Sequence, residues 1–157
     1  MRKQNLKNEL PQTIIDRCVG SVSYVSKNDT LLGALCFNDT PRQEASRTVT
    51  ELRALGINRF VMLTGDRSEV AQRICTATGI DEYLAQLLPE DKLNSIRSIK
   101  AEHKVLAIGD GINDALALKE AHVGIAMGAM GSDLAIQSAD IALMNNNLLN
   151  IPFAVRL

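Results

Sequence analysis

The densest set of polar groups in the sequence follows the apolar run Val105 to Ile108. In Gly109-Asp110-Gly111-Ile112-Asn113-Asp114, two carboxylates stand four residues apart, one at the end of an expected strand and one in the first turn of the next helix. Carboxylates placed in this way can face a common point, where a hard cation such as Mg²⁺ sits with waters. The loop therefore predicts a Mg²⁺ site at Asp110 and Asp114. The alternative is that Asp110 or Asn113 only caps the helix.

A second candidate loop, Thr64-Gly65-Asp66, ends the apolar run Phe60 to Thr64. A hydroxyl and free backbone amides just before a helix N-terminus form an anion pocket, because the unpaired N–H groups and the helix dipole both favour negative charge. An ordinary strand-to-helix turn uses the same residue types. The loop is thus a candidate phosphate site, with the plain turn as the alternative.

A third candidate is Lys92, in the segment Pro89-Glu90-Asp91-Lys92. Pro89 suits the first position of a helix, which puts Lys92 in the first turn, where the helix dipole disfavours a cation. This position is explained if the lysine reaches a phosphoryl group or a carboxylate. Otherwise Lys92 is solvated surface.

These residues lie in a sequence whose short apolar runs alternate with helical patterns from about residue 31 onward, which is typical of βαβ units around a mostly parallel sheet. The candidate loops follow expected strands, at the edge of an open α/β sheet where ligands bind. The expected strands are Leu31 to Phe37, Phe60 to Thr64, Tyr83 to Gln86, Val105 to Ile108, Val123 to Met127 and Ile141 to Leu143. The expected helices are Arg42 to Leu55, Glu69 to Thr78, Pro89 to Lys100, Asn113 to Lys119, Ser132 to Ser138 and Leu148 to Arg156.

The first thirty residues differ from the rest, because they are polar and aperiodic at the start. The stretch from Ser21 to Phe37 is consistent with a hairpin that turns at Lys27-Asn28-Asp29. We therefore expect an amino-terminal segment or hairpin over residues 1–30 and an α/β domain over residues 31–157.

Composition and charge exclude several classes of protein. The formal net charge is −1 and aromatic residues make up 3%, so the sequence has neither a phosphate-tracking patch nor a base-stacking platform, and no nucleic-acid partner is expected. No apolar run approaches the roughly 20 residues of a transmembrane helix, and no secretory signal is recognisable, so a cytoplasmic location is expected. Cys18, Cys36 and Cys75 include no CxxC pair, and we expect reduced core thiols rather than a zinc site.

Taken in order, TGD, PEDK and GDGIND resemble the motifs of the haloacid dehalogenase (HAD) superfamily, and of its P-type ATPases in particular. Asp39-Thr40-Pro41-Arg42 is similar to the D-P-x-R segment of that family. The runs ALGINRFVMLTGD, GDGINDALAL and VGIAMGAMGSDLAIQSADIALM resemble the heavy-metal branch, and the form GAMGSD is closer to zinc, cadmium, lead or cobalt exporters than to copper exporters. The resemblance covers residues 31–157. It implies the carboxyl-terminal half of a phosphorylation domain, with a Rossmann-like (HAD-like), mostly parallel sheet and helices on both faces.

The resemblance implies a role for each residue that matches a motif. Thr64 and Gly65 would bind phosphoryl oxygens, and Asp66 would help to organise the nucleotide. Lys92 would neutralise charge that develops on the transferred phosphoryl group. These roles agree with phosphoryl transfer in general, where positioning and electrostatic stabilisation supply most of the catalysis.

The same resemblance implies the cofactors and partners. Asp110 would bind Mg²⁺, with Asn113 and Asp114 completing the site. ATP would be the nucleotide of the parent pump, which exports a heavy-metal cation. The implied partners are Mg²⁺, phosphate or nucleotide, and the remainder of the pump, namely its nucleotide-binding domain and membrane helices.

Departures from the family pattern are as informative as the matches. The nucleophilic aspartate of the family sits in a D-K-T-G-T sequence, which this chain lacks, so the isolated chain is expected to form no aspartyl-phosphate and to be inactive. His122 stands where the family has Asp, and is explained as a tolerated loop residue. The leading hypothesis is a fragment of a heavy-metal pump. The alternatives are a free-standing HAD-like binding or regulatory protein without catalysis, and a small HAD phosphatase that uses Asp39.

The resemblance also implies a gap in the sheet. The nucleophile strand of the superfamily lies between the strand that ends in TGD and the strand that ends in GDG. An empty place there would leave main-chain groups unsatisfied, at about 1–3 kcal/mol each. The candidates to fill it are direct pairing of the two flanking strands, insertion of Leu31 to Phe37, or a strand from a second copy in a domain-swapped dimer. We favour Leu31 to Phe37, because its length and apolarity suit a central strand.

Overall fold

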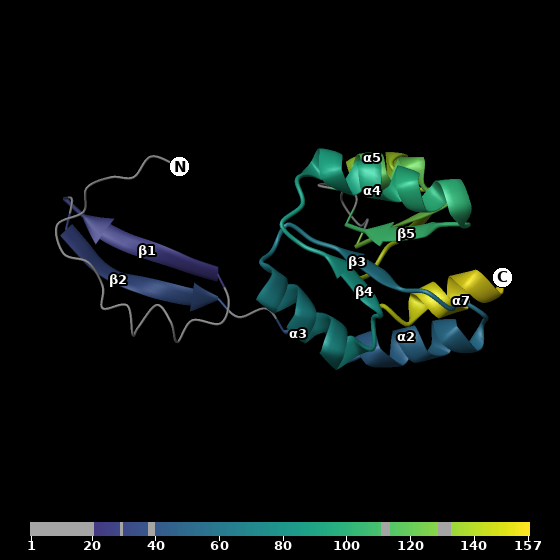
Figure 1. Cartoon of the computed structure of the whole chain (residues 1–157), viewed down its shortest axis with the longest axis horizontal. Coiled ribbons are helices and arrows are strands. Elements are labelled where there is room, and N and C mark those ends of the chain that lie inside the picture. The colour runs from purple at the N-terminus through teal and green to yellow at the C-terminus, as the bar shows by residue number, and fades with distance from the viewer. Residues whose placement is uncertain (1–20, 29, 38–39, 111–113, 129–132) are drawn as a thin grey trace. The chain divides into compact units, whose positions relative to one another are not determined.

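The computed structural model describes residues 21–28, 30–37, 40–110, 114–128 and 133–157. Contacts divide the chain into two compact units, Met1–Pro41 and Arg42–Leu157, whose elements are labelled in Figure 1. The division falls later in the chain than the predicted boundary after residue 30, because both strands of the hairpin belong to the first unit.

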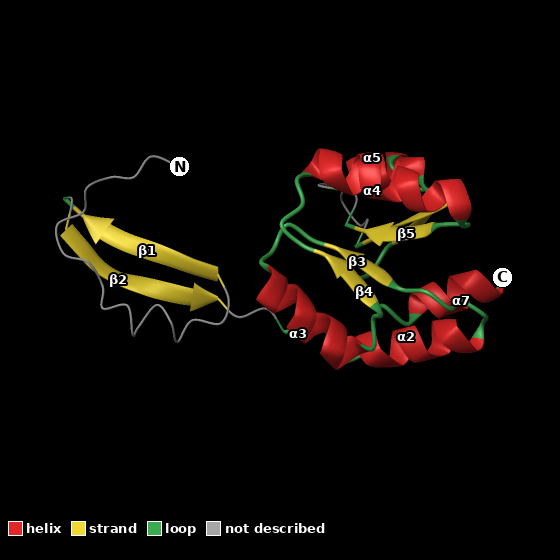
Figure 2. Cartoon of the chain, in the orientation of Figure 1, coloured by secondary structure: helices red, strands yellow, loops and turns green. Residues whose placement is uncertain are grey.

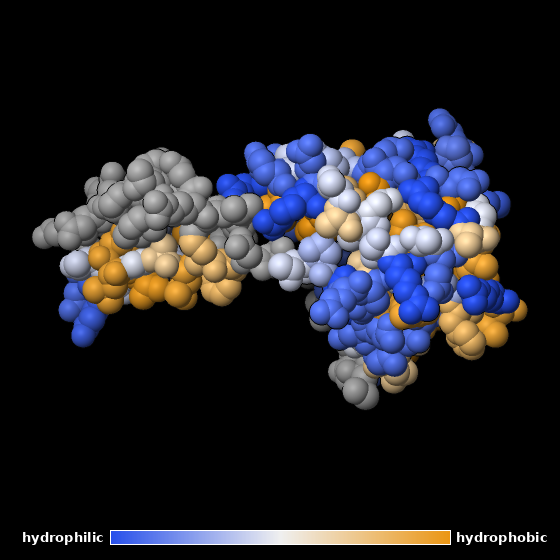
Figure 3. All heavy atoms as spheres, turned by 90° about the horizontal axis from the view of Figure 1, so that it is seen from below, coloured by the Kyte–Doolittle hydropathy of each residue, from blue (hydrophilic) through white to orange (hydrophobic). Residues whose placement is uncertain are grey.

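The first unit contains an antiparallel hairpin, as predicted. β1 (Ser21–Lys27) pairs with β2 (Thr30–Phe37) along its whole length. Asn28 in the turn has a φ of 48°, in the left-handed region that asparagine tolerates better than most residues. Apolar side chains gather along the hairpin on the side seen in Figure 3. The most exposed on β2 are Leu32, Leu35 and Phe37.

The cysteines depart in part from the expectation of reduced core thiols. Cys75 is a free, buried cysteine, and burial raises the pKa of its thiol. Cys36 is disulfide-bonded, which corrects the expectation for that residue. Cys18 lies outside the described residues.

The second unit is an α/β domain with helices on both faces of its strands, as predicted. α4 and α5 cover one face, and α2, α3 and α7 cover the other (Figure 2). The helices are α2 (Ala45–Ala54), α3 (Ser68–Thr78), α4 (Pro89–Glu102), α5 (Ala115–Glu120), α6 (Asp133–Gln137) and α7 (Asn150–Arg156). The strands are β3 (Val61–Leu63), β4 (Glu82–Leu84), β5 (Leu106–Gly109), β6 (Val123–Met127) and β7 (Ile141–Leu143).

Parallel pairing organises these strands into two half-sheets. β3 pairs with β4, while β5 pairs with β6 and β6 with β7, all in parallel register. Within the described ranges, no hydrogen-bonded ladder joins β3 to β5. A cavity of ≈ 1170 Å³ lies between the half-sheets, lined by residues of both strands.

This gap contradicts the favoured prediction for Leu31 to Phe37. β2 forms a two-stranded sheet with β1, so the prediction that it fills the central position is wrong, and direct pairing of the flanking strands does not occur either. The physical reason is proximity in sequence. β1 offers β2 an antiparallel partner across a short turn, and closing a short loop costs little conformational entropy.

Side chains, in place of hydrogen bonds, connect the two half-sheets. Leu63 of β3 packs against a buried cluster that includes Ala107 of β5 and Leu118 of α5. On the opposite face, Phe60 packs against a cluster that includes Ile125 of β6 and Ile151 of α7. The core is therefore continuous through apolar contacts even though the sheet is not.

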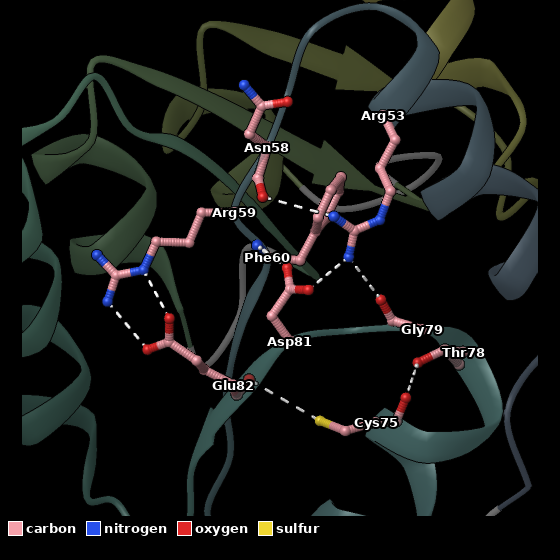
Figure 4. Close-up of polar contacts among 9 residues, drawn as sticks. All are labelled: Arg53, Asn58, Arg59, Phe60, Cys75, Thr78, Gly79, Asp81 and Glu82. Carbon is pink, nitrogen blue, oxygen red and sulfur yellow. Dashed lines mark hydrogen bonds and ion pairs between the residues drawn. The ribbon is translucent and has the colours of Figure 1, made fainter.

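A polar cluster around Arg53 fixes the amino-terminal ends of β3 and β4 (Figure 4). The Arg53 guanidinium at the end of α2 donates to Asp81 Oδ1 at 2.6 Å and to the Gly79 carbonyl at 2.9 Å. It also lies 4.8 Å from the centre of the Phe60 ring. Asp81 Oδ2 accepts from the Phe60 N–H at 2.9 Å, and these bonds hold the pKa of the Asp81 carboxyl below its ordinary value. One arginine thus links α2, the C-cap of α3 and the start of β3.

Gly124 allows α5 to lie directly against β6. A Cβ atom at this position would stand 2.6 Å from the Leu118 carbonyl oxygen, well inside van der Waals contact. The Gly124 N–H donates to Asp140 Oδ2 at 2.8 Å, and the Asp140 N–H donates to the Gly124 carbonyl at 2.9 Å. These bonds fix the start of β6 beside the segment that leads into β7.

Candidate active site

Lys92 and Asp114 form an ion pair at the wall of the cavity. Lys92 Nζ lies 2.7 Å from Asp114 Oδ1, and the two side chains are 17% and 25% exposed. Lys92 thus reaches a carboxylate from the first turn of α4, against the preference of the helix dipole. A partly buried, charge-assisted bond of this length is worth more than a surface pair, on the order of 1.5–3 kcal/mol.

The start of α4 fixes the position of Lys92. Pro89 is the first residue of the helix, and Leu88 is its N-cap. The Leu88 N–H donates to Asp91 Oδ2 at 2.9 Å, and the Lys92 N–H donates to the Leu88 carbonyl at 3.1 Å. These two hydrogen bonds fix the backbone of the first turn, from which the Lys92 side chain extends to Asp114.

Gly109 makes room for the Asp114 side chain. A Cβ atom on Gly109 would lie 3.0 Å from both Asp114 Cβ and Asp114 Oδ2. Asp114 precedes α5, and its carbonyl accepts from the Leu118 N–H at 2.9 Å. The carboxylate therefore folds back over the end of β5, and Oδ2 is the oxygen that Lys92 leaves unoccupied.

The Thr64-Gly65-Asp66 loop is closed by two internal hydrogen bonds. Thr64 Oγ1 donates to Asp66 Oδ2 at 3.0 Å and accepts from the Asp66 N–H at 3.1 Å. The loop leads into α3, whose amino end has no side-chain cap bond. Its first amides thus keep the positive end of the helix dipole available to an anion.

The segment after β4 brings the Thr64 loop and the Lys92 turn together. The Leu87 N–H donates to the Thr64 carbonyl at 3.0 Å, and the Gln86 N–H donates to the Asp66 carbonyl at 2.8 Å. Leu88, the next residue, is the N-cap that holds Lys92. The carboxyl ends of β3 and β5 therefore face the same region, as the sequence predicted for parallel strands.

The structure describes only part of the predicted site. Asn113 and Asp39 lie outside the described residues. Asp110 follows directly on β5 and is exposed. Among the residues that the structure describes, no group of three His, Cys, Asp or Glu side chains is placed to hold a metal ion. Mg²⁺ in phosphoryl-transfer sites takes one or two carboxylates and keeps several waters, so the hard oxygens of Asp110 and Asp114 fit that ion.

Sequence reasoning missed the part that His122 plays. The imidazole Nδ1 of His122 accepts from the backbone N–H of Val105 at 3.1 Å, and the backbone N–H of His122 donates to the Val105 carbonyl at 3.0 Å. The side chain thus ties the start of β5 to the start of β6. Desolvation, together with Lys104 and Lys100, lowers the pKa of this imidazole. The sequence did contain a signal for this role, because His122 stands where the family pattern has Asp and both side chains can accept a hydrogen bond.

Comparison with known proteins places the chain in a family. The model of haloacid dehalogenase-like hydrolases matches residues 6–122. The chain belongs to this hydrolase family. It is 46% identical over 134 residues to a probable cadmium-transporting ATPase of Staphylococcus aureus, covering 85% of this chain and 17% of that protein. It is 49% identical over 120 residues to a manganese-exporting P-type ATPase of Mycobacterium tuberculosis, covering 76% and 17%.

A solved structure of a zinc-transporting PIB-type ATPase in its E2.Pi state superposes with a TM-score of 0.74 at 38% identity, over 92% of this chain and 24% of that one. The predicted resemblance to heavy-metal P-type ATPases and the HAD-like fold are confirmed. The chain spans about a sixth of the length of these curated relatives. No helix in the described ranges is long and apolar enough to cross a membrane.

Proposed function

We propose that this chain is the Mg²⁺- and phosphoryl-binding part of the phosphorylation domain of a heavy-metal cation-transporting P-type ATPase, on the cytoplasmic side of the parent pump. The observation that carries the proposal is the Lys92–Asp114 pair at 2.7 Å. It joins the residue that ends the GDGIND segment to the first turn of α4, and Leu87, just before that turn, is hydrogen-bonded to Thr64 of the TGD loop. The names of its relatives include a probable cadmium-transporting ATPase and manganese- and zinc-exporting P-type ATPases, so the proposed cargo is the class of heavy-metal cations.

Each residue has a defined task in the proposed site. Mg²⁺, held by Asp110 and Asp114, would neutralise charge on a phosphoryl group. Lys92 supplies a cation within reach of that group, and Asp114 orients the lysine. Thr64 and Gly65 offer a hydroxyl and a backbone amide, which preorganised loops use to hold phosphoryl oxygens. Asn113 would complete the metal side of the site.

The chain holds no D-K-T-G-T sequence, so the covalent step belongs to the parent pump. There, a carboxylate oxygen would attack the terminal phosphorus of ATP, and the bond from that phosphorus to the bridging oxygen would break with ADP as the leaving group. The tasks left to this chain are positioning and charge neutralisation. We expect the isolated chain to bind without turning over.

Titration with Mg²⁺ and inorganic phosphate tests this proposal. Amide resonances of the 109–114 loop should shift with Mg²⁺ at millimolar concentration, and those of Thr64, Gly65 and Asp66 should shift when phosphate follows. Asp110→Asn should abolish the Mg²⁺ response, whereas Asp133→Asn, which changes an acidic residue on α6, should leave it unchanged. A response that is equal in both variants would contradict the proposed site.

A further inference from the structure

Gln86 has an unusual backbone conformation between β4 and α4. Its φ of 58° lies in the left-handed region, which glycine adopts freely and a residue with a Cβ atom adopts only at a cost. Among the described residues of the second unit, it is the only residue other than glycine with a positive φ. The Gln86 side chain is exposed, so its burial does not account for the conformation. A costly backbone conformation persists where the surrounding contacts require it.

Two backbone hydrogen bonds supply that requirement. The Gln86 N–H donates to the Asp66 carbonyl at 2.8 Å, and the next N–H along the chain, that of Leu87, donates to the Thr64 carbonyl at 3.0 Å. In an extended strand, successive N–H groups point to opposite sides, so they could not both reach one loop. The left-handed conformation turns them toward the same side. It thereby ties the chain after β4 to both ends of the Thr64-Gly65-Asp66 loop.

The segment between Gln86 and Lys92 has little remaining conformational freedom. Leu88 is extended, with φ −76° and ψ 163°, as is favoured before proline, and the ring of Pro89 fixes its own φ. The Leu88 carbonyl accepts from the Lys92 N–H at 3.1 Å, and Lys92 Nζ lies 2.7 Å from Asp114 Oδ1. The backbone angle of Gln86 therefore sets the direction in which the chain leaves β4 and begins α4.

We propose that Gln86 is a positioning residue of the candidate active site. Its left-handed backbone holds the Lys92 ammonium at a fixed place relative to the Thr64-Gly65-Asp66 loop, so that both contact the same phosphoryl group. This assignment rests on the proposed function and deepens it. The role belongs to the backbone angle and not to the amide side chain. Glycine and asparagine, which tolerate the left-handed region best, can therefore replace Gln86.

Substitutions at residue 86 of the full chain test the assignment. Gln86→Gly and Gln86→Asn keep the left-handed conformation accessible, whereas Gln86→Val does not, because a β-branched residue is an outlier there. Asn28→Val is the matched control, since Asn28 is the other described non-glycine residue with a positive φ and belongs to the hairpin of the first unit. Circular dichroism and urea unfolding check that each variant folds.

Hydrogen exchange measures the positioning without any ligand. In Gln86→Val, the Leu87 amide should exchange at least about tenfold faster, because backbone strain makes it easier to open the bond to Thr64. The ammonium protons of Lys92, observed by nitrogen-15 NMR, should also exchange faster, because the contact with Asp114 loosens. In Gln86→Gly and Gln86→Asn, both groups should be protected as in the parent chain.

Titrations with inorganic phosphate and with Mg²⁺ separate positioning from a general loss of structure. In Gln86→Val, the dissociation constant for phosphate should rise at least about tenfold, because a charge-assisted hydrogen bond from Lys92 is lost. Mg²⁺ should bind at least as tightly as in the parent chain, because Lys92 no longer occupies Asp114 Oδ1. Unfolding of the site would weaken the binding of both ions. Gln86→Gly, Gln86→Asn and Asn28→Val should bind both ions as the parent does.

Four results would overturn the assignment. One is unchanged exchange of the Leu87 amide in Gln86→Val, and another is equal loss of protection in Gln86→Gly, which would assign the role to the side chain. The third is weaker binding of Mg²⁺ and phosphate together in Gln86→Val, and the fourth is the same set of changes in Asn28→Val. A parent chain that does not respond to phosphate would refute the proposed function. The exchange of Leu87 and Lys92 would still decide whether Gln86 positions the lysine.

Discussion

Replacement of Lys92 by methionine should tighten the binding of Mg²⁺ to the isolated chain. Methionine keeps the unbranched length of the side chain and removes its charge. Lys92 Nζ lies 2.7 Å from Asp114 Oδ1, so it occupies one oxygen of a proposed Mg²⁺ ligand and places a positive charge beside the ion. The change therefore frees a carboxylate oxygen and removes a repulsion.

The size of the effect follows from Coulomb's law. Two unit charges 4 Å apart interact by about 1 kcal/mol in water, and the double charge of Mg²⁺ raises this to about 1.5–2 kcal/mol at ~4–5 Å. Both side chains are less than a third exposed, so screening is weaker than in bulk water and this figure is a lower bound. At 1.4 kcal/mol per factor of ten, Lys92→Met should lower the dissociation constant for Mg²⁺ by at least about tenfold.

Amide shifts of Gly109, Asp110 and Asp114 measure that constant. Lys92→Arg, which keeps the charge, should give no comparable tightening. Lys100→Met is the matched control, because Lys100 pairs with Glu120 and stands outside the candidate site. An unchanged or weaker affinity in Lys92→Met would refute the electrostatic account of the pair. Phosphate binding should move in the opposite direction, since the variant loses a cation that faces the anion.

Three further predictions concern stability, pH and catalysis. Arg53→Ala should lower the free energy of unfolding in urea by about 1–3 kcal/mol, because it removes hydrogen bonds to the Asn58 and Gly79 carbonyls, the ion pair with Asp81 and the ring contact. Arg47→Ala, at an exposed i,i+4 pair, should change it by less than about 0.5 kcal/mol. The pKa of His122 is held below its ordinary value of 6.5, so as the pH falls the unfolded chain takes up a proton before the folded chain does, and the free energy of unfolding should decrease below about pH 6.5. His122→Asn keeps a hydrogen-bond acceptor that does not titrate. In this variant the urea midpoint should depend less on pH between about pH 7 and about pH 5. The isolated chain should trap no covalent phosphate from radiolabelled ATP, and label that disappears in Asp39→Ala would instead support the phosphatase alternative.

The order and type of the elements in the second unit could be predicted from the sequence. Apolar runs such as Val123 to Met127 and Ile141 to Leu143 match strands residue for residue, because buried parallel strands are short and apolar and are bounded by polar loops. Pro89 marked the first residue of α4, and Gly79 marked the end of α3 with a φ of 80°. Local rules were sufficient at these positions.

The pairing partner of an apolar strand could not be predicted in the same way. Leu31 to Phe37 has the composition of a central strand, yet it pairs with β1. Composition indicates that a segment can be buried, but it does not indicate which other strand will pair with it. The Lys92–Asp114 contact was likewise open, because the two residues are 22 positions apart and only the folded chain shows which acceptor the lysine reaches. Both cases concern contacts between elements, which local patterns do not encode.

The break between the half-sheets bears on how the second unit melts. In a continuous sheet, loss of one strand removes the ladder of its neighbours, which helps to make unfolding of small domains all-or-none. Here β3 and β4 are coupled to β5, β6 and β7 through apolar side chains such as Leu63 and Phe60. Apolar contacts are less directional than a hydrogen-bonded ladder, so heat should loosen the half-sheets in separable steps. The van't Hoff enthalpy of the unit should then be smaller than its calorimetric enthalpy.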